Sequence, residues 1–280
     1  MPAVLRLVTV PYDSARHRVG LGAAPAAWLA AGAEERLAGG AVSTVEVVCP
    51  PDLGELAASF AVAREVAREV RAAWDAGASP VVLAGNCGTS LGVVAGLPAR
   101  TGLLWLDAHG DLNLPSTTTS GYVDGMCLSA ITGRCWEALV ATVPGFVPVP
   151  DERVVLVGAH ALDPAEERLL AGAGIEHLTV DRIRAGQAQP VLDALADRVD
   201  RLHVHVDLDV LDTSAGRANR WATPGGLQPD EVVGLVRGAA GRLPLASLTL
   251  ASWDPALDDD GRVREAGLAL LEIAAELLAR

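Results

Sequence analysis

The sequence predicts an α/β fold with a mainly parallel sheet that is covered by helices on both faces. Short apolar runs that suit buried strands alternate with alanine-rich stretches that suit helices. Several runs are apolar at consecutive positions, as a strand covered on both faces requires. A strand followed by a helix, repeated along the chain, is typical of a parallel sheet.

The apolar runs predict strands over residues 4–10, 81–84, 102–106, 153–157, 202–206 and 246–251. The clearest helix spans residues 60–74, where Val62, Val66 and Val70 recur at every fourth position and charged residues fill the other faces. Helices are also predicted over 229–241, where Pro229 precedes two acidic residues, and over 267–280. No linker or repeat interrupts the pattern, so we expect one domain over residues 1–280.

Composition excludes several classes of protein. The 280 residues carry a net charge of −13, whereas a nucleic-acid-binding protein is usually basic. All 22 basic residues are arginine, which excludes a P-loop lysine and a Schiff-base lysine. No apolar run approaches the roughly 20 residues that span a membrane. Because there is no signal-peptide pattern and no CxxC pair, we expect a cytoplasmic protein with reduced cysteines.

Acidic residues and a histidine follow two of the predicted strands. Asp107, His109 and Asp111 come after the strand at 102–106, and Asp207 and Asp209 come after the strand at 202–206. Alternate side chains of an extended chain share a face, so each set can converge. Either pattern alone is common in polar loops, but five such groups together would cost several kcal/mol without a cation. Four carboxylates can balance two divalent ions such as manganese, with a bridging water or hydroxide as nucleophile.

The segment after the strand at 81–84 has two interpretations. Residues 88–92 match the GxSxG nucleophile elbow, which would make Ser90 the nucleophile of a hydrolase. That hypothesis needs an acid and then a histidine further along the chain, and no histidine follows His205. The favoured interpretation is that Cys87 faces the metal ions.

These residues resemble the ureohydrolase family, which includes arginases and agmatinases. Residues 107–111 resemble its DAHxD motif, residues 207–212 its DxDxxDP motif, and residues 223–227 its TPxxGGL motif. The resemblance extends from the first strand to about residue 255. It implies the arginase-like fold, which is a three-layer α/β/α sandwich with a mainly parallel sheet, and a cofactor of two Mn²⁺ ions.

The resemblance also implies roles for the metal-binding residues. Asp107 and Asp207 would bridge the two ions. Asp111 would complete the shell of one ion, and His109 and Asp209 that of the other. Cys87 stands where the family has a histidine ligand. A thiolate suits manganese poorly, although a coordinated thiol would be deprotonated.

The substrate implied by the resemblance is a small guanidino amino acid. Asn113 and Ser120 match positions that hold an α-carboxylate, and Asp163 matches the acid that meets the α-amino group. Thr223, in the TPxxGGL-like segment, is expected to bind substrate as well. Agmatine has no α-carboxylate, so these matches favour an amino acid.

Two more departures bear on the substrate. Asp124 replaces the histidine that is the proposed proton shuttle of arginases, and Ser252 replaces the glutamate that faces the guanidinium group. A guanidinium group is always charged in water, and Ser252 cannot supply an anion to meet it. An N-hydroxyguanidine is much less basic, and Asp124 or Ser252 could hydrogen-bond its hydroxyl.

Cysteine at the first ligand position is also found in one variant of the family, the N(omega)-hydroxy-L-arginine amidinohydrolase of D-cycloserine biosynthesis. This resemblance implies an antibiotic-pathway hydrolase that forms L-ornithine and hydroxyurea, with Asp209 or Asp124 protonating the leaving amine. Two alternatives stay open: an arginase or other guanidino-acid hydrolase, and a non-catalytic amino-acid-binding relative. The oligomeric state is left open.

Overall fold

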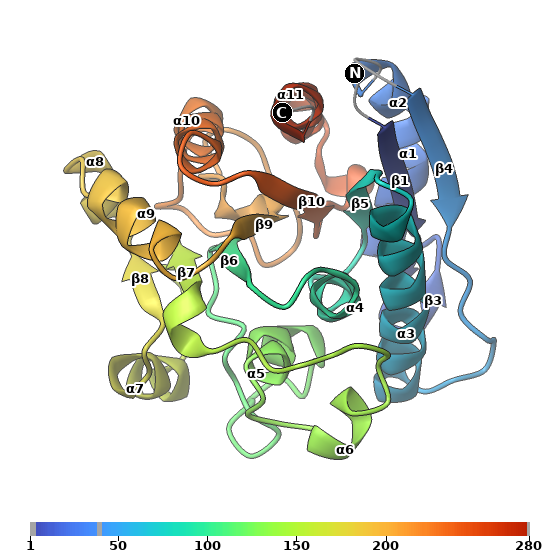
Figure 1. Cartoon of the computed structure of the whole chain (residues 1–280), viewed down its shortest axis with the longest axis horizontal. Helices are drawn as coiled ribbons and strands as arrows, with labels where there is room; N and C mark the ends of the chain where they lie inside the picture. Colours follow the sequence, from blue (N-terminus) through green and yellow to red (C-terminus); the bar gives the residue numbers. More distant parts are fainter. Residues whose placement is uncertain (1–3, 38–40, 279–280) are drawn as a thin grey trace.

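The computed structural model describes residues 4–37 and 41–278. Its centre is an eight-stranded sheet in the order β4-β1-β5-β10-β9-β6-β7-β8, in which all neighbouring strands are parallel (Figure 1). The eight strands are β1 (Val4–Val10), β4 (Ala41–Glu46), β5 (Ser79–Ala84), β6 (Thr101–Leu106), β7 (Val154–Val157), β8 (Glu176–Leu178), β9 (Arg201–Asp207) and β10 (Leu245–Ala251). A short antiparallel pair, β2 (Tyr12–Asp13) and β3 (Arg16–His17), lies apart from this sheet.

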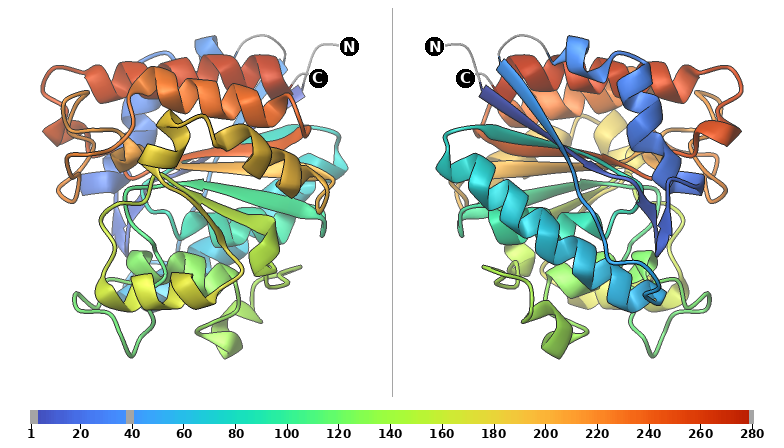
Figure 2. Two further views of the ribbon diagram at one scale, coloured as in Figure 1. Left: turned by 90° about the vertical axis from the view of Figure 1, so that its left-hand side faces the viewer. Right: turned by 90° about the vertical axis from the view of Figure 1, so that its right-hand side faces the viewer.

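Helices cover both faces of the sheet, which gives three layers (Figure 2). One face packs against α1 (Ala24–Ala30), α2 (Ala33–Arg36), α8 (Val180–Arg184), α9 (Ala188–Ala196), α10 (Pro229–Ala240) and α11 (Arg262–Leu278). The other face packs against α3 (Glu55–Asp75), α4 (Thr89–Gly96), α5 (Cys127–Ile131), α6 (Glu137–Val140) and α7 (Pro164–Gly172). Short 3₁₀ helices occupy Gly20–Ala23, Asp124–Met126, Asp151–Arg153, Leu208–Val210 and Pro255–Leu257.

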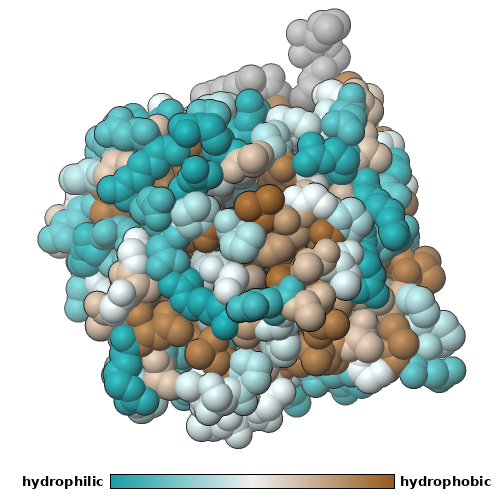
Figure 3. All heavy atoms as spheres, turned by 60° about the horizontal axis from the view of Figure 1, so that its bottom comes forward, coloured by the Kyte–Doolittle hydropathy of each residue, from teal (hydrophilic) through white to brown (hydrophobic). Residues whose placement is uncertain are grey.

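The two hydrophobic cores follow from the alternation of side chains along each strand. In β6, Leu104 and Leu106 belong to one core, and Leu103 and Trp105 belong to the other. The outer surface over α5, α6 and α7 carries apolar patches between hydrophilic ones (Figure 3). In the segment that follows α6, Val147 is 66% exposed. The predicted three-layer α/β/α fold is confirmed.

Most predicted elements agree with the structure in place and type. The six predicted strands are all present, and the helix predicted at 60–74 is the middle of the longer α3. The helix predicted at 267–280 begins earlier, at the start of α11, and residues 279 and 280 lie outside the described residues. Strands β4 and β8 were not predicted. No described helix is both long and apolar enough to cross a membrane.

The order of the strands creates a crevice at one edge of the sheet. Strands β6 and β9 are neighbours, but the chain continues from β6 to β7 on one side and from β9 to β10 on the other. The connections that follow these two strands therefore run to opposite sides. Ligands of open α/β sheets bind at such a switch point, beyond the carboxyl ends of the strands. Asp107 follows β6 directly and Asp207 ends β9, so the topology alone brings the two acidic motifs together.

Candidate metal centre and substrate cavity

Two sets of potential metal ligands meet at this edge of the sheet. The ligand atoms of Cys87, Asp107 and Asp207 lie within 4.8 Å of one another, and those of Asp107, His109 and Asp209 form a second such set. Asp107 belongs to both sets, so two ions bound here would share its carboxylate. Burial raises the pKa of both Asp107 and Asp207, and repulsion from Asp209 adds to this. A buried cluster of repelling carboxylates fits a site for divalent cations.

Neighbouring donors hold these carboxylates in place. Trp105 Nε1 donates to Asp107 Oδ2 at 3.1 Å, and the backbone N–H of His109 donates to the other oxygen at 2.7 Å. Asn219 Nδ2 donates to Asp209 Oδ2 at 3.1 Å. Such partners orient metal ligands and tune their affinity. Trp105 and Asn219 were not predicted at the site, because both lie outside the predicted ligand motifs.

Asp111 lies at the margin of this cluster. Its carboxylate belongs to neither of the two sets, although it lines the same cavity as Cys87 and Asp207. Cys127 Sγ donates to Asp111 Oδ2 at 3.1 Å, and Asp111 has a left-handed backbone, with φ of 50°. Burial and repulsion from Asp107 raise the pKa of Asp111 well above its usual value. Cys127 was not expected at the site, because no motif surrounds it.

Cys87 reaches the cluster from the turn that links β5 to α4. Its Sγ lies 3.0 Å from Asp207 Oδ2 and 3.1 Å from Ser252 Oγ. A side chain at Gly85, two residues earlier, would approach Tyr12 O within 2.0 Å, so this turn requires glycine. Burial and the nearby Asp207 carboxylate raise the pKa of Cys87, so a cation is needed to make it a thiolate.

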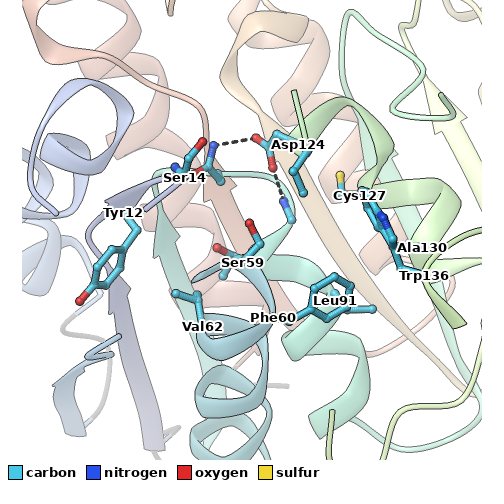
Figure 4. A pocket seen from close by; sticks show the side chains of 14 residues that line it. Tyr12, Ser14, Ser59, Phe60, Val62, Leu91, Asp124, Cys127, Ala130 and Trp136 are labelled. Atoms are coloured by element: carbon cyan, nitrogen blue, oxygen red, sulfur yellow. Dashed lines mark hydrogen bonds between the residues drawn. The ribbon is translucent and has the colours of Figure 1, made fainter. Parts of the chain in front are cut away.

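Asp124 holds the same turn. Its carboxylate accepts hydrogen bonds from the backbone N–H groups of Gly88, at 2.7 Å, and Cys87, at 3.0 Å, and from Asn86 Nδ2, at 2.9 Å. Burial raises the pKa of Asp124 to about 6, although these bonds oppose the change. Asp124 also lines a second, small cavity of about 40 Å³ beside Phe60 (Figure 4). Asp124 therefore borders both this small cavity and the one that contains the metal cluster.

A cavity of about 230 Å³ opens from the metal cluster. Four of the predicted substrate-binding residues line it, namely Asn113, Ser120, Asp163 and Ser252. Thr223 does not line it, and its hydroxyl lies 3.0 Å from His160 Nε2 instead. Asn219, Trp221 and Tyr122 also line it. From the segment after Asp209, Asn219 and Trp221 line the cavity, so the substrate-binding role of Thr223 stays a prediction from the motif.

The placement of Ser90 is unsuited to a nucleophile. Ser90 Oγ lies 2.8 Å from His205 Nδ1, so a serine–histidine pair does exist. Both side chains are fully buried, and neither lines the cavity. Burial also lowers the pKa of His205 well below its usual value. This pair is inaccessible to a substrate, so the hydrolase-elbow hypothesis is wrong.

Comparison with known proteins points to one family. The family model described as "Arginase family" matches residues 3–279. The arginase of Bacillus caldovelox is 28% identical over 95% of this chain and 96% of its own length. The arginase of Brevibacillus brevis is 32% identical over 70% of this chain and 68% of its own. The crystal structure of arginase from Bacillus cereus superposes with a TM-score of 0.87 at 27% identity and covers 99% of both chains. The chain belongs to the arginase family, whose members are hydrolases of guanidino groups.

Proposed function

We propose that this protein hydrolyses N(omega)-hydroxy-L-arginine to L-ornithine and hydroxyurea. The observation that carries the proposal is the hydroxyl of Ser252, which lies 3.1 Å from Cys87 Sγ at the metal end of the cavity. A hydroxyl offers hydrogen bonds but no charge, so it suits the weakly basic N-hydroxyguanidine better than a guanidinium ion. The product hydroxyurea would suit the D-cycloserine pathway that the resemblance implies.

The metal ligands in this proposal are Cys87, Asp107, His109, Asp111, Asp207 and Asp209, and the ions are two Mn²⁺. Bound divalent ions supply Lewis acidity and an activated water for attack on the guanidino carbon. Asp124 or Ser252 accepts or donates a hydrogen bond at the N-hydroxyl of the substrate. Asp209 or Asp124 delivers a proton to the ornithine amine as it leaves.

The amino-acid end of the substrate lies at the other end of the cavity in this proposal. Asp163 receives the α-amino group, and Asn113 and Ser120 donate to the α-carboxylate. Asn113 Nδ2 already donates to Asp163 Oδ2 at 2.9 Å, so the two side chains are held together in advance. Such preorganisation reduces the entropy lost when the substrate binds.

Hydrolysis of L-arginine is the second candidate. It is favoured by the relatives, because those that match this chain over most of their length are named arginases. The two candidates differ only in the group that meets Ser252 and Asp124. They can therefore be separated by the substrate alone.

The test offers both compounds to the manganese-loaded protein and measures ornithine, urea and hydroxyurea. We expect the hydroxylated substrate to react at least about tenfold faster, a difference in barrier of about 1.4 kcal/mol. Faster turnover of L-arginine would replace the proposal by ordinary arginase activity. No turnover of either compound would favour the non-catalytic binding relative.

A further inference from the structure

The proposed hydrolysis makes no use of the buried serine–histidine pair. His205 is fully buried in β9, two residues before Asp207, and Ser90 is fully buried in the first turn of α4. Ser90 Oγ lies 2.8 Å from His205 Nδ1, and the other ring nitrogen of His205 has no hydrogen-bond partner among the described residues. The orientation of the imidazole ring therefore depends on Ser90.

The imidazole ring of His205 supports the indole ring of Trp105. The two rings are stacked, with centroids 3.7 Å apart and planes 18° apart, and the two residues are paired in register between β9 and β6. Planar rings at this separation are in van der Waals contact, so the indole cannot tilt toward His205. The plane of the Trp105 ring is thereby fixed from one side.

Trp105 transmits this support to the carboxylate that both ligand sets share. Its Nε1 donates to Asp107 Oδ2 at 3.1 Å, and both side chains are buried. The direction of this hydrogen bond depends on the plane of the indole, because the Nε1–H bond lies in that plane. A rotated ring would leave a buried carboxylate with one hydrogen bond fewer. A chain of contacts thus leads from Ser90 through His205 and Trp105 to Asp107.

The same pair also connects metal ligands that come from different elements. The backbone N–H of Ser90 donates to Cys87 O at 2.9 Å, so Ser90 belongs to the turn that carries Cys87. Asp107 follows β6, and Asp207 ends the strand that contains His205. His205 is therefore linked to each member of the ligand set Cys87, Asp107 and Asp207.

We propose that His205 is a positioning residue of the metal centre, which orients Asp107 through Trp105 and is itself held by Ser90. This inference deepens the proposed function, because it rests on the metal centre that the hydrolysis requires. Loss of the imidazole ring loosens the carboxylate that the two ions share, so both ions bind more weakly. The two residues that cannot act as nucleophile and base thus stabilise the site from behind its ligands.

The first test measures Mn²⁺ binding by calorimetry on the chelator-treated full chain, for the wild type and for His205→Leu. Leucine is also a large side chain, but it lacks a planar ring and a hydrogen bond to Ser90. We expect the Mn²⁺ dissociation constant to rise about tenfold, the lower end of the range for loss of a residue that orients metal ligands. The visible absorption of bound Co²⁺ depends on ligand geometry and should change as well.

His203→Leu is the matched control. His203 lies on the same face of β9, is equally buried, and has its Nδ1 2.6 Å from Ser247 Oγ. Its register partner in β6 is Leu103, which has neither a ring nor a side-chain donor. The two leucine variants should lose similar amounts of unfolding free energy. The Mn²⁺ affinity of His203→Leu should stay within about twofold of the wild type, and its Co²⁺ absorption should be unchanged.

A double-mutant cycle tests the route through Trp105. Trp105→Phe keeps an aromatic ring but removes the N–H group that donates to Asp107. If His205 acts through this N–H group, His205→Leu should weaken Mn²⁺ binding by less than about twofold further in the Trp105→Phe background. Ser90→Ala removes only the hydrogen bond to the imidazole, so it should weaken binding by a smaller factor than His205→Leu. It also provides the measurement if His205→Leu does not fold.

Three results would overturn the inference. One is an equal loss of Mn²⁺ affinity in His205→Leu and His203→Leu, which would make His205 a packing residue only. Another is wild-type affinity in Ser90→Ala, and the third is full additivity of His205→Leu and Trp105→Phe. None of these measurements needs turnover, so a failure to hydrolyse any guanidine would remove the proposed function and leave the positioning role intact. A wild type that binds no Mn²⁺ would remove both.

Discussion

Cys87 is the residue on which the character of the metal centre depends. Its sulfur lies 3.0 Å from Asp207 Oδ2, close enough for both to bind one ion. Because a thiolate is a soft ligand, it binds Co²⁺ with a sulfur-to-metal charge-transfer absorption that oxygen and nitrogen ligands lack. We expect this band in the cobalt-loaded wild type and its loss in Cys87→Ser, as measured by near-ultraviolet absorption.

Cys127→Ser is the control for this prediction. Cys127 is also buried, and its Sγ lies 3.1 Å from Asp111 Oδ2. The band should survive this substitution, because Cys127 belongs to neither ligand set. If the band disappears with Cys127 and persists without Cys87, the ligand assignment is reversed.

Sequence motifs predicted the site residues that directly follow strands, but they did not predict the cavity residues that lie between motifs. Asp107 and Asp209 could be located because a strand end fixes where the next side chain points. Asn219 and Trp221 lie in an irregular segment whose path depends on tertiary contacts. That path turns residue 223 toward His160, which spacing alone could not reveal.

Among the elements, the contact between α3 and α4 positions the turn that carries Cys87. A Cβ at Gly92 in α4 would lie 2.4 Å from Ala63 O and 2.8 Å from Val66 Cβ of α3. Replacing Gly92 with alanine must push the helices apart, so we expect a loss of about 1–3 kcal/mol in unfolding free energy. Chemical denaturation measures this loss, and the manganese affinity should fall with it.

Gly234 provides the matched control within another helix. It lies in α10, and a Cβ there would meet no atom within 4 Å. Gly234→Ala should therefore stabilise the protein by about 0.5–1 kcal/mol through helix propensity alone. If both alanine variants are equally stable, close packing of α3 on α4 does not constrain the turn.

The elements that escaped prediction are those with the weakest hydrophobic pattern. Strand β4 is an edge strand whose residues are all exposed or half-buried, and β8 has three residues. Each is defined by pairing with a longer neighbour rather than by its own apolar run. The central strands were predictable because both of their faces are buried.

For the molecule as a whole, the metal cluster links stability to pH. Without bound cations, burial would lower the pKa of His109, but the hydrogen bonds that its ring donates to the carboxylates of Asp107 and Asp209 raise it to about 12. The folded state then holds a proton that the unfolded chain has released above its ordinary pKa of about 6.5. Stability of the metal-free protein must therefore fall as pH rises through the range above 7.

His203 also titrates differently in the folded and unfolded states, and this limits the pH range in which the effect of His109 can be observed. Burial lowers the pKa of His203 to about 3, so that group strengthens the fold with rising pH only up to its unfolded value. Above about pH 7 it is neutral in both states and contributes nothing. Between about pH 7 and 8.5, His109 contributes a slope of roughly 1.4 kcal/mol per pH unit. The buried carboxyls of Asp111 and Asp207, whose pKa is also raised, add to the slope in the same direction.

Metal binding reverses this dependence, because cations require deprotonated ligands and bind more tightly as pH rises. We expect the chelator-treated protein to unfold at a lower temperature at pH 8.5 than at pH 7. The manganese-loaded protein should be more stable than the chelator-treated one, by about 2.7 kcal/mol per site at a hundredfold excess over Kd. The difference in stability between the manganese-loaded and the chelator-treated protein should be larger at pH 8.5 than at pH 7. Thermal unfolding of His109→Asn in chelator tests the contribution of this group, since the pH slope of that variant should be shallower than that of the wild type. An unchanged slope in the variant would assign the linkage to other residues and remove His109 from the cluster that the cations neutralise.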